Sequence, residues 1–530
     1  MAVVERPAAS TRAGNTSTRT YGNWRRPLSA GIGSFGLIGT AIVFAGFIAM
    51  ILANAIGGLI PAVITAAVAV AALGVVVIRD RHGRSLGQRA VGRLAWANAQ
   101  RLGGHLYRSG PLGRARWGTH QLPGLLAASS LTEHTDSYGR PFALLHVPAT
   151  GHYSVVLATE PEGAAGVDAE QVDSWVANWG AWLASLGDEP GLVAVSVTVE
   201  TAPDTGTRLR REIALHADPD APAIAQAILA ETARTAPQGA ATVRAWVALT
   251  FTATGAVGGV PSSVSGGRRR KPEEVGHDLA ARLPGISGGL EATGGGVARP
   301  VSAQGLCEVV RGAFDPAAVR LLEEAHAVGA TPELSWTDVG PTAAQATWGA
   351  YRHDSGLSCT WAMSVAPRGT VRSSVLEHLL APHPRIDRKR VTMLYRPVDS
   401  ARAARIVEQD KRNADVRATS TKRPSSRVLV EQRAATATAD EEAAGAGLLS
   451  FGMLVTATVA STGSGSAAGG VDGDAALEDA MATVDNLAAT ARLTLRPAYG
   501  SQDSAFTAAL PLGLHLPAHL KVPDSIREAL

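Results

Sequence analysis

Residues 31–78 form an unbroken apolar run that contains no Asp, Glu, Lys or Arg. The hydrocarbon core of a bilayer is about 30 Å thick, and a helix needs about 20 apolar residues to cross it. The run is therefore long enough for two crossings. A glycine pair at residues 57–58, with Pro61 just beyond, is typical of a tight turn followed by the first turn of a new helix. We predict two transmembrane helices, residues 34–53 and 59–78, joined by that turn.

Arginines flank this hairpin on both sides. They are Arg6, Arg12, Arg19, Arg25 and Arg26 before it, and Arg79, Arg81, Arg84, Arg89 and Arg93 after it. The turn carries no charge, so the positive-inside rule predicts a multi-pass protein of the cytoplasmic (inner) membrane with its N- and C-termini in the cytoplasm. The alternatives are a signal peptide, which a second apolar run would not follow at once, and a buried hairpin of a soluble protein.

Composition sets broad limits on the rest of the chain. With 530 residues, 46% of them hydrophobic, there is room for two or three further domains. The net charge of +3 indicates no overall nucleic-acid footprint. Cys307 and Cys359 lie far apart and no second pair accompanies them, so neither a disulfide framework nor a metal site is predicted.

The hairpin is flanked by two segments of different character. Residues 1–30 are polar and rich in Ser, Thr and Arg, and we interpret them as a disordered cytoplasmic tail. Residues 79–110 are predicted to form a basic amphipathic linker helix, with Leu86 and Leu94 on its apolar face. That helix either packs on the domain that follows or anchors on anionic lipid headgroups, and the two interpretations are compatible.

The remaining chain is predicted to be α+β, with two similar mixed α/β modules at residues 111–254 and 346–530. A Gly-rich linker with helices, residues 255–345, separates them. Both modules show the order strand, strand, helix, strand, helix, strand. In the first these are residues 142–147, 153–159, 169–186, 192–200, 221–235 and 242–252. In the second they are residues 347–352, 358–365, 371–380, 390–395, 400–444 with a break at Pro424, and 448–460. A helix and a strand, residues 474–492 and 493–497, follow.

Few patterns point to chemistry. The loop at residues 461–470 lies between a strand and a helix but lacks the Lys of a phosphate-binding P-loop. Basic clusters at residues 268–271 and 385–390 fit solvated loops, or contacts with lipid headgroups, nucleic acid or an acidic partner. The tryptophans of the helix at residues 169–186 fit a helix docked on a sheet, or a stacking platform. We predict no catalytic, cofactor-binding or metal-binding residue, and the histidines show no ligand spacing.

The C-terminal run carries a family resemblance. Residues 495–517, with Gln502, Phe506 and the pair Leu510-Pro511, resemble the junction in conjugative type IV secretion ATPases where the amino-terminal domain meets the motor domain. The hairpin resembles the two-span PrgI-type subunits associated with such ATPases. The chain is thus similar to an actinobacterial conjugation-associated membrane protein family that joins the two parts. In such an ATPase the motor domain would begin near the position of Leu530, so the resemblance implies the part of the ATPase that precedes the motor domain.

A second family has a similar outline. EccE of type VII secretion also places two spans before a cytoplasmic domain, and residues 107–131 and 172–186 fit either family. Both resemblances imply a non-enzymatic subunit of a secretion or DNA-transfer complex, oligomeric within it. The implied partners are a secretion or conjugation ATPase and other membrane subunits, with direct nucleic-acid contact left open. A membrane-tethered enzyme is the competing class. We also expect residues 502–517 to pack against the second module.

Overall fold

The structure is a computed structural model of the chain. It describes residues 21–22, 24, 36–80, 82–113, 119–236, 240–254, 269–367, 369–420, 423–461 and 473–520. The predicted tail thus lies outside the described residues except at three positions. At one of them, Tyr21, the backbone forms an isolated antiparallel bridge with Val371, so the chain is held at that point.

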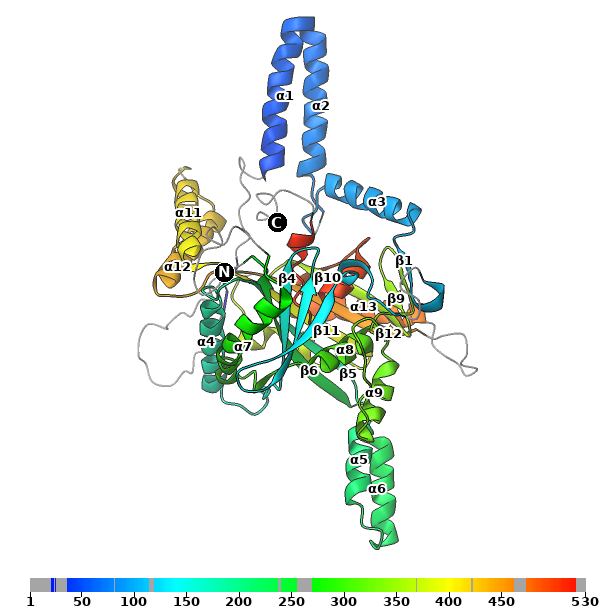
Figure 1. The fold of residues 1–530 in the computed structure, drawn as a ribbon. Coiled ribbons are helices and arrows are strands. Elements are labelled where there is room, and N and C mark those ends of the chain that lie inside the picture. The colour runs from blue at the N-terminus through cyan, green and yellow to red at the C-terminus, as the bar shows by residue number, and fades with distance from the viewer. Residues whose placement is uncertain are drawn as a thin grey trace.

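Two apolar helices, α1 (Gly36–Gly57) and α2 (Leu59–Val77), form a hairpin that stands clear of the body (Figure 1). Both are long and apolar enough to cross a membrane. The turn is narrower than predicted, because the Gly58 N–H still donates to the Asn54 carbonyl (3.0 Å) and Gly58 alone reverses the chain at φ +79°. The helices approach closely at Gly46, where an added Cβ would lie 2.6 Å from the Cβ of Ala69.

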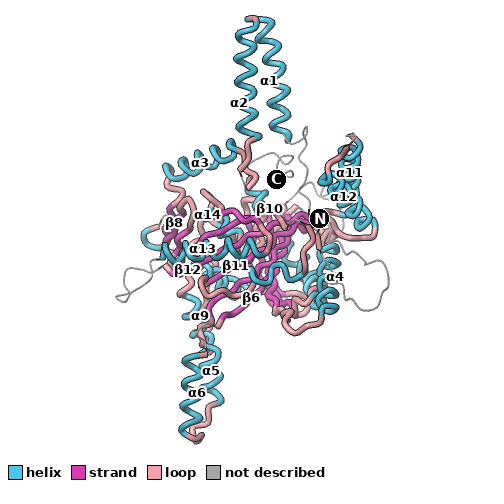
Figure 2. Tube along the Cα trace, turned by 180° about the vertical axis from the view of Figure 1, so that it is seen from behind, coloured by secondary structure: helices cyan, strands magenta, loops and turns pink. Residues whose placement is uncertain are grey.

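The body is built on one antiparallel sheet, shown in magenta in Figure 2, which agrees with the predicted α+β class. The strand order is β1-β8-β9-β10-β12-β11-β5-β6-β4-β3-β2, with β13 on β10 and β7 on β4. One end of this order holds strands from the first half of the body, and the other end holds strands from the second half.

The first half of the sheet contains six strands. They are β2 (Ser130–Thr135), β3 (Pro141–Val147), β4 (His152–Thr159), β5 (Leu192–Pro203), β6 (Ala241–Thr252) and β7 (Ala298–Pro300). Its helices are α4 (Ala169–Ser185), α5 (Thr207–His216), α6 (Ala223–Thr235), α7 (Pro272–Gly288), α8 (Ala303–Phe314) and α9 (Ala318–Ala327). Helix α7 and strand β7, from the predicted linker region, pack on this half of the sheet.

The second half contains another six strands and an edge strand. They are β8 (Ala343–Ala346), β9 (Tyr351–His353), β10 (Gly356–Val365), β11 (Arg388–Pro397), β12 (Leu449–Ala460), β13 (Thr494–Pro497) and, from earlier in the chain, β1 (Leu106–Arg108). The helices are α10 (Glu377–Leu380), α11 (Ser400–Thr419), α12 (Ser426–Ala443), α13 (Gly473–Thr490) and α14 (Gln502–Ala508). Helix α3 (Leu86–Arg101) connects the hairpin to the body.

The two halves join at the centre of the sheet. Strand β5 pairs with β11 in antiparallel register from Thr201 opposite Lys389 to Val195 opposite Tyr395. Outward from this seam the strand order is β5, β6, β4, β3, β2 on one side and β11, β12, β10, β9, β8 on the other. The two halves, which the Gly-rich linker region separates in the sequence, are therefore joined by one continuous ladder.

The C-terminal segment lies across the seam. Phe506, Leu510 and Leu512 are fully buried, in a core that also holds residues of the first half such as Leu145 and Trp246. This segment is hydrogen-bonded to both halves, and the bond from Thr392 Oγ1 to the Ala509 carbonyl is 2.8 Å long. The segment packs against the second module as expected, on β9, β10 and β12, and its apolar side chains also fill space against the first half.

Several local predictions also need correction. Residues 347–350 form a turn between β8 and β9 instead of starting a strand, because the Thr347 side chain and backbone bond Ala350. The helix predicted at residues 371–380 is shortened to a 3₁₀ turn, Ser373–Leu376, and the single turn α10. Strand β2 and helix α5 were missed, since both are short and largely polar.

Candidate functional site

A row of buried polar side chains runs along one face of the second half and the seam. Hydroxyl groups pair across neighbouring strands, as in Thr360 with Thr456 at 2.9 Å and Thr198 with Thr392 at 3.1 Å. The row is covered by α14, whose Gln502 side chain accepts from the Thr360 N–H (2.8 Å) and donates to the Thr360 carbonyl (3.2 Å). These groups satisfy one another inside the protein, so the row is part of the core.

His353 is the histidine most suggestive of catalysis, because it bonds a serine. Its Nδ1 lies 2.6 Å from the Phe314 carbonyl and its Nε2 lies 2.8 Å from Ser358 Oγ. A carbonyl only accepts, so Nδ1 carries the proton and Nε2 accepts from the serine hydroxyl. Burial lowers the pKa of His353 to about 4. Both side chains are fully buried, and the pair therefore holds the core together as a neutral group.

The basic cluster predicted at residues 385–390 is mostly not a solvated loop. Arg388 and Arg390 are buried on β11 and flank the buried carboxylate of Glu200 on β5. Burial would raise the pKa of Glu200, but Arg388 and Arg390 outweigh it and hold that pKa below its ordinary value. Lys389 points to the opposite face, and burial lowers its pKa to about 8. Only Arg385 remains exposed.

The second basic cluster, residues 268–271, divides in a similar way. Arg268 lies outside the described residues. Arg270 is buried, and its Nη1 lies 3.0 Å from Asp278 Oδ2. The pair closes the end of α7 against β6, so this arginine has a structural partner, and Arg269 and Lys271 are the exposed members.

The tryptophans of α4 mainly dock that helix. Trp182 is buried and its Nε1 donates to the Ile286 carbonyl (3.1 Å). Trp179 stacks on Trp182, with 5.1 Å between ring centroids, and meets Tyr395 edge-on at 6.0 Å. Trp179 and Tyr395 also line an apolar cavity of about 300 Å³ over the seam. The docked interpretation is therefore correct for Trp182, while Trp179 retains a face toward this cavity.

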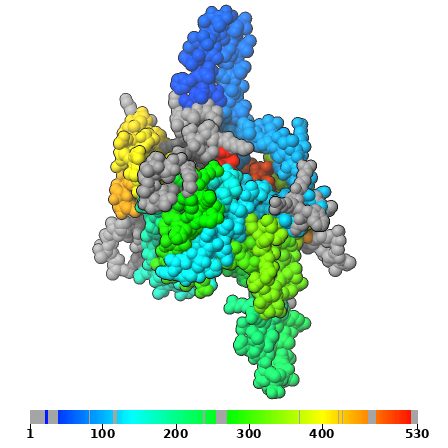
Figure 3. All heavy atoms as spheres, viewed as in Figure 1, coloured from blue at the N-terminus to red at the C-terminus, as the bar shows by residue number. Residues whose placement is uncertain are grey.

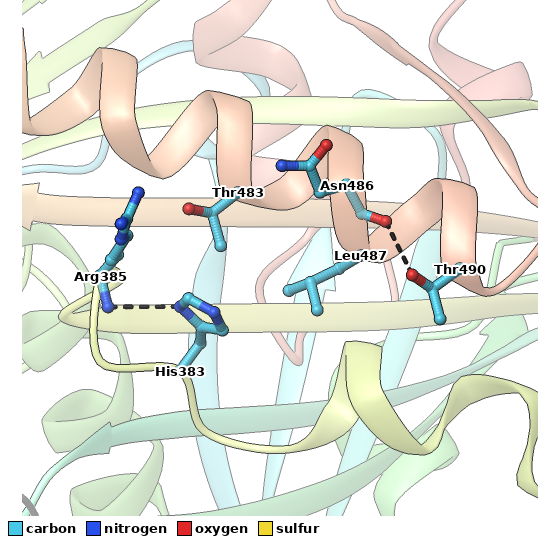
Figure 4. Close-up of a pocket in the computed structure, with 6 residues that line it drawn as sticks. All are labelled: His383, Arg385, Thr483, Asn486, Leu487 and Thr490. Atoms are coloured by element: carbon cyan, nitrogen blue, oxygen red, sulfur yellow. Dashed lines mark hydrogen bonds between the residues drawn. The ribbon is translucent and has the colours of Figure 1, made fainter.

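A second cavity, of about 320 Å³, opens on the surface beside α13 (Figure 4). It is lined by His383, Arg385, Thr483, Asn486, Leu487 and Thr490. The two threonines donate to carbonyls of their own helix. Burial and the nearby cations Lys389 and Arg385 lower the pKa of His383, so its imidazole is neutral near pH 7. The Arg385 guanidinium and the Asn486 amide are then the polar groups left for a ligand in this cavity, and these two groups do not indicate which class of ligand would bind.

The most exposed parts of the body are two helical hairpins, which we call arms. The far arm, α5–α6, projects from the end opposite the α1–α2 hairpin (Figures 1 and 3). None of its helical residues is buried, and Leu215, Ile224 and Ile228 are 65%, 70% and 59% exposed. Its base is held by Glu323, which lies 2.8 Å from Arg244 and also accepts from Thr205.

The side arm, α11–α12, lies on the flank of the body. The break between its helices at Pro424 agrees with the prediction. The helices pack on each other through small residues, including Ala414 and Ala435, and leave Val416 and Val430 65% and 57% exposed. The arms follow β5 and β11 respectively, so each is inserted after one strand of the central seam.

Comparison with known proteins adds one match. Residues 28–88 match the model of a family described as a domain of unknown function, DUF8461. The match covers the α1–α2 hairpin and the start of α3, and leaves the body unmatched. No curated protein matches the chain.

Proposed function

We propose that this protein is a non-enzymatic integral membrane subunit of a secretion or conjugative DNA-transfer apparatus, which recruits a separately encoded ATPase at the cytoplasmic face. In this proposal α1 and α2 cross the cytoplasmic membrane and both chain termini are cytoplasmic. The observation that carries it is the combination of a spanning-length hairpin with two arms, on one continuous sheet, that expose apolar side chains.

The arms support a role in assembly. Exposed apolar side chains at adjacent helical positions, such as Ile224 and Ile228, are typical of surfaces that bind another protein. The far arm is held to the body only at its base, so most of its surface is open to a large partner. Its distance from the α1–α2 hairpin suits a partner in the cytoplasm.

We further propose that the body consists of two copies of one module. The mirrored strand order about the seam supports this, as does the insertion of a helical arm after β5 and after β11. After each arm a strand, a helix and a short strand follow in the same sequence, with β7 on β4 and β13 on β10. Tandem duplication would give the subunit two related binding arms.

Two alternative functions are compared with this proposal. An EccE-like subunit of type VII secretion has the same outline and would associate with a different set of proteins. A membrane-tethered enzyme would need a reactive group open to substrate, whereas the His353 and Ser358 pair is buried and neutral. This burial supports the non-enzymatic proposal.

The test is affinity purification of the full-length protein from its native membranes, with partners identified by mass. A Walker-motif ATPase of the conjugative type would support the proposal. Type VII components and small WXG-type proteins would assign it to the EccE alternative. Ile224→Ser with Ile228→Ser is expected to reduce recovery of the ATPase at least tenfold. Tyr138→Ser, at a 74% exposed turn of the body, is the matched control and should leave it unchanged.

A further inference from the structure

Helix α3 leaves the hairpin at a sharp angle and runs sideways from the base of α2 in both views (Figures 1 and 2). The connection is short and well bonded. The Asp80 carboxylate accepts from the N–H groups of His82 (2.9 Å) and Arg84 (3.0 Å). A capping box then starts the helix, with Ser85 and Gln88 bonding each other's backbone N–H groups at 3.2 and 3.1 Å. These hydrogen bonds therefore fix the direction of α3 relative to α2.

One side of α3 is attached to the body. Trp96 packs against the core and meets Trp348 and His105 edge-on, with 6.2 Å between ring centroids in each case. Because successive residues of a helix are 100° apart, Leu94 and Val91 lie on the side opposite Trp96. They are 71% and 66% exposed. The helix thus packs on the following domain, as one interpretation expected, but through its Trp96 side, and the side with Leu94 and Val91 is left exposed.

Positive charge lies at one border of the exposed side of α3, because Arg93 is about 100° around the helix from Leu94, while Arg89 is turned toward the Trp96 side. The helix contains Arg89, Arg93 and Arg101 and no acidic residue, and Arg84 lies just before it. Arg496, at the end of β13, lies close to this group. Its pKa is lowered by burial and also by the nearby charge of Arg84. Cations thus gather where the hairpin meets the body.

We propose that α3 is an interfacial helix that lies on the cytoplasmic surface of the bilayer, with Leu94 and Val91 among the acyl chains and Arg93 on anionic headgroups. The inference rests on the proposed membrane location of the hairpin. It commits to lipid as the occupant because α3 continues directly from a spanning helix and combines an apolar side with an arginine at its border. With Trp96 fixed to the body, α3 would hold the sheet at a set distance from the membrane.

The test places single cysteines in the full-length protein, reconstituted in nanodiscs with brominated acyl chains. The native Cys307 and Cys359 are buried and should not react. A fluorophore on Leu94→Cys is expected to be quenched at least twofold more than one on Leu215→Cys, an exposed apolar position on the far arm. Quenching of the label at Leu94 no greater than at Leu215 would overturn the proposal.

Two further variants separate the possible failures. A label on Phe44→Cys, midway along α1, reports insertion of the hairpin. If it is quenched and Leu94→Cys is not, α3 is free of lipid although the membrane location holds. If neither is quenched, the membrane location itself fails, and this inference with it. Protection of the label at Leu94 in native membranes but not in nanodiscs would identify a protein as the occupant and contradict the proposal.

The headgroup part of the proposal has its own measurement. Quenching at Leu94 should be stronger in discs with anionic phosphatidylglycerol than in discs of phosphatidylcholine alone. Arg93→Gln should lower the docking equilibrium in anionic discs by about fivefold and leave neutral discs unaffected. Equal quenching of the label on Leu94→Cys, with Arg93 intact, in both lipids would show that Arg93 does not bind headgroups.

Discussion

Glu200 offers the sharpest test of how the two halves are held together. Its carboxylate lies at the seam, 3.3 Å from Arg388 Nη1 and 3.0 Å from Arg390 Nε, and also accepts from Arg390 Nη2. Replacing it in Glu200→Gln leaves two buried guanidinium groups without their counter-charge. Loss of one partner of a buried ion pair costs about 3–5 kcal/mol. The free energy of opening the body should fall by that amount.

The native thiols provide the assay. Cys307 and Cys359 are buried, and burial raises the pKa of each to about 12, so they react with a thiol reagent only when the body opens. A loss of 3–5 kcal/mol corresponds to labelling that is faster by roughly 100- to 4000-fold, since each 1.4 kcal/mol is a factor of ten. The measurement uses the full-length protein in detergent, with reclosing kept faster than labelling.

Two comparisons make this prediction refutable. Glu323→Gln breaks the more exposed Arg244 pair and should cost only about 0–1 kcal/mol. Replacing Glu200, Arg388 and Arg390 together by Met removes all three charges and should restore most of the protection. If the thiols of Glu200→Gln are labelled at a rate within threefold of the wild-type rate, the buried cluster of Glu200, Arg388 and Arg390 does not stabilise the seam and the reasoning fails.

Three further predictions follow from single sites. Phe506→Ala should destabilise the body by about 3–5 kcal/mol in the thiol assay, whereas Val328→Ala, 81% exposed, should change it by less than about 0.5 kcal/mol; equal effects would mean that the C-terminal segment does not fill the core. The pKa of His353 falls from 6.5 to about 4 on folding, so the free energy of unfolding is not reduced by this group above pH 6.5 and should decline by roughly 3 kcal/mol as the pH falls to 4. His353→Gln should flatten this dependence of the unfolding free energy on pH. The same dependence in the variant and the wild type would contradict the assignment to His353. A membrane-impermeant thiol reagent should label Ala55→Cys in intact cells and Tyr138→Cys only after permeabilisation, and the reverse pattern would refute the proposed topology.

Patterns that depend on near neighbours were predictable from the sequence. The hairpin follows from a run of apolar residues, and the break at Pro424 follows from the chemistry of one residue, because proline cannot continue a helix. The strands at β4, β5 and β12 and the helices at α4 and α13 also lie close to their predicted positions. Hydrophobic period and helix breakers act over a few residues, so no knowledge of distant contacts is needed.

The placement of charge was decided by tertiary structure. In the sequence Arg388, Lys389 and Arg390 resemble a solvated basic cluster, yet all three are buried, because Glu200 reaches the two arginines from a strand nearly two hundred positions earlier. The exposed apolar side of α3 depends in the same way on how Trp96 attaches the helix to the body. Amphipathic patterning indicated that α3 has an apolar side, but only long-range packing determines which side the body covers and which it leaves exposed.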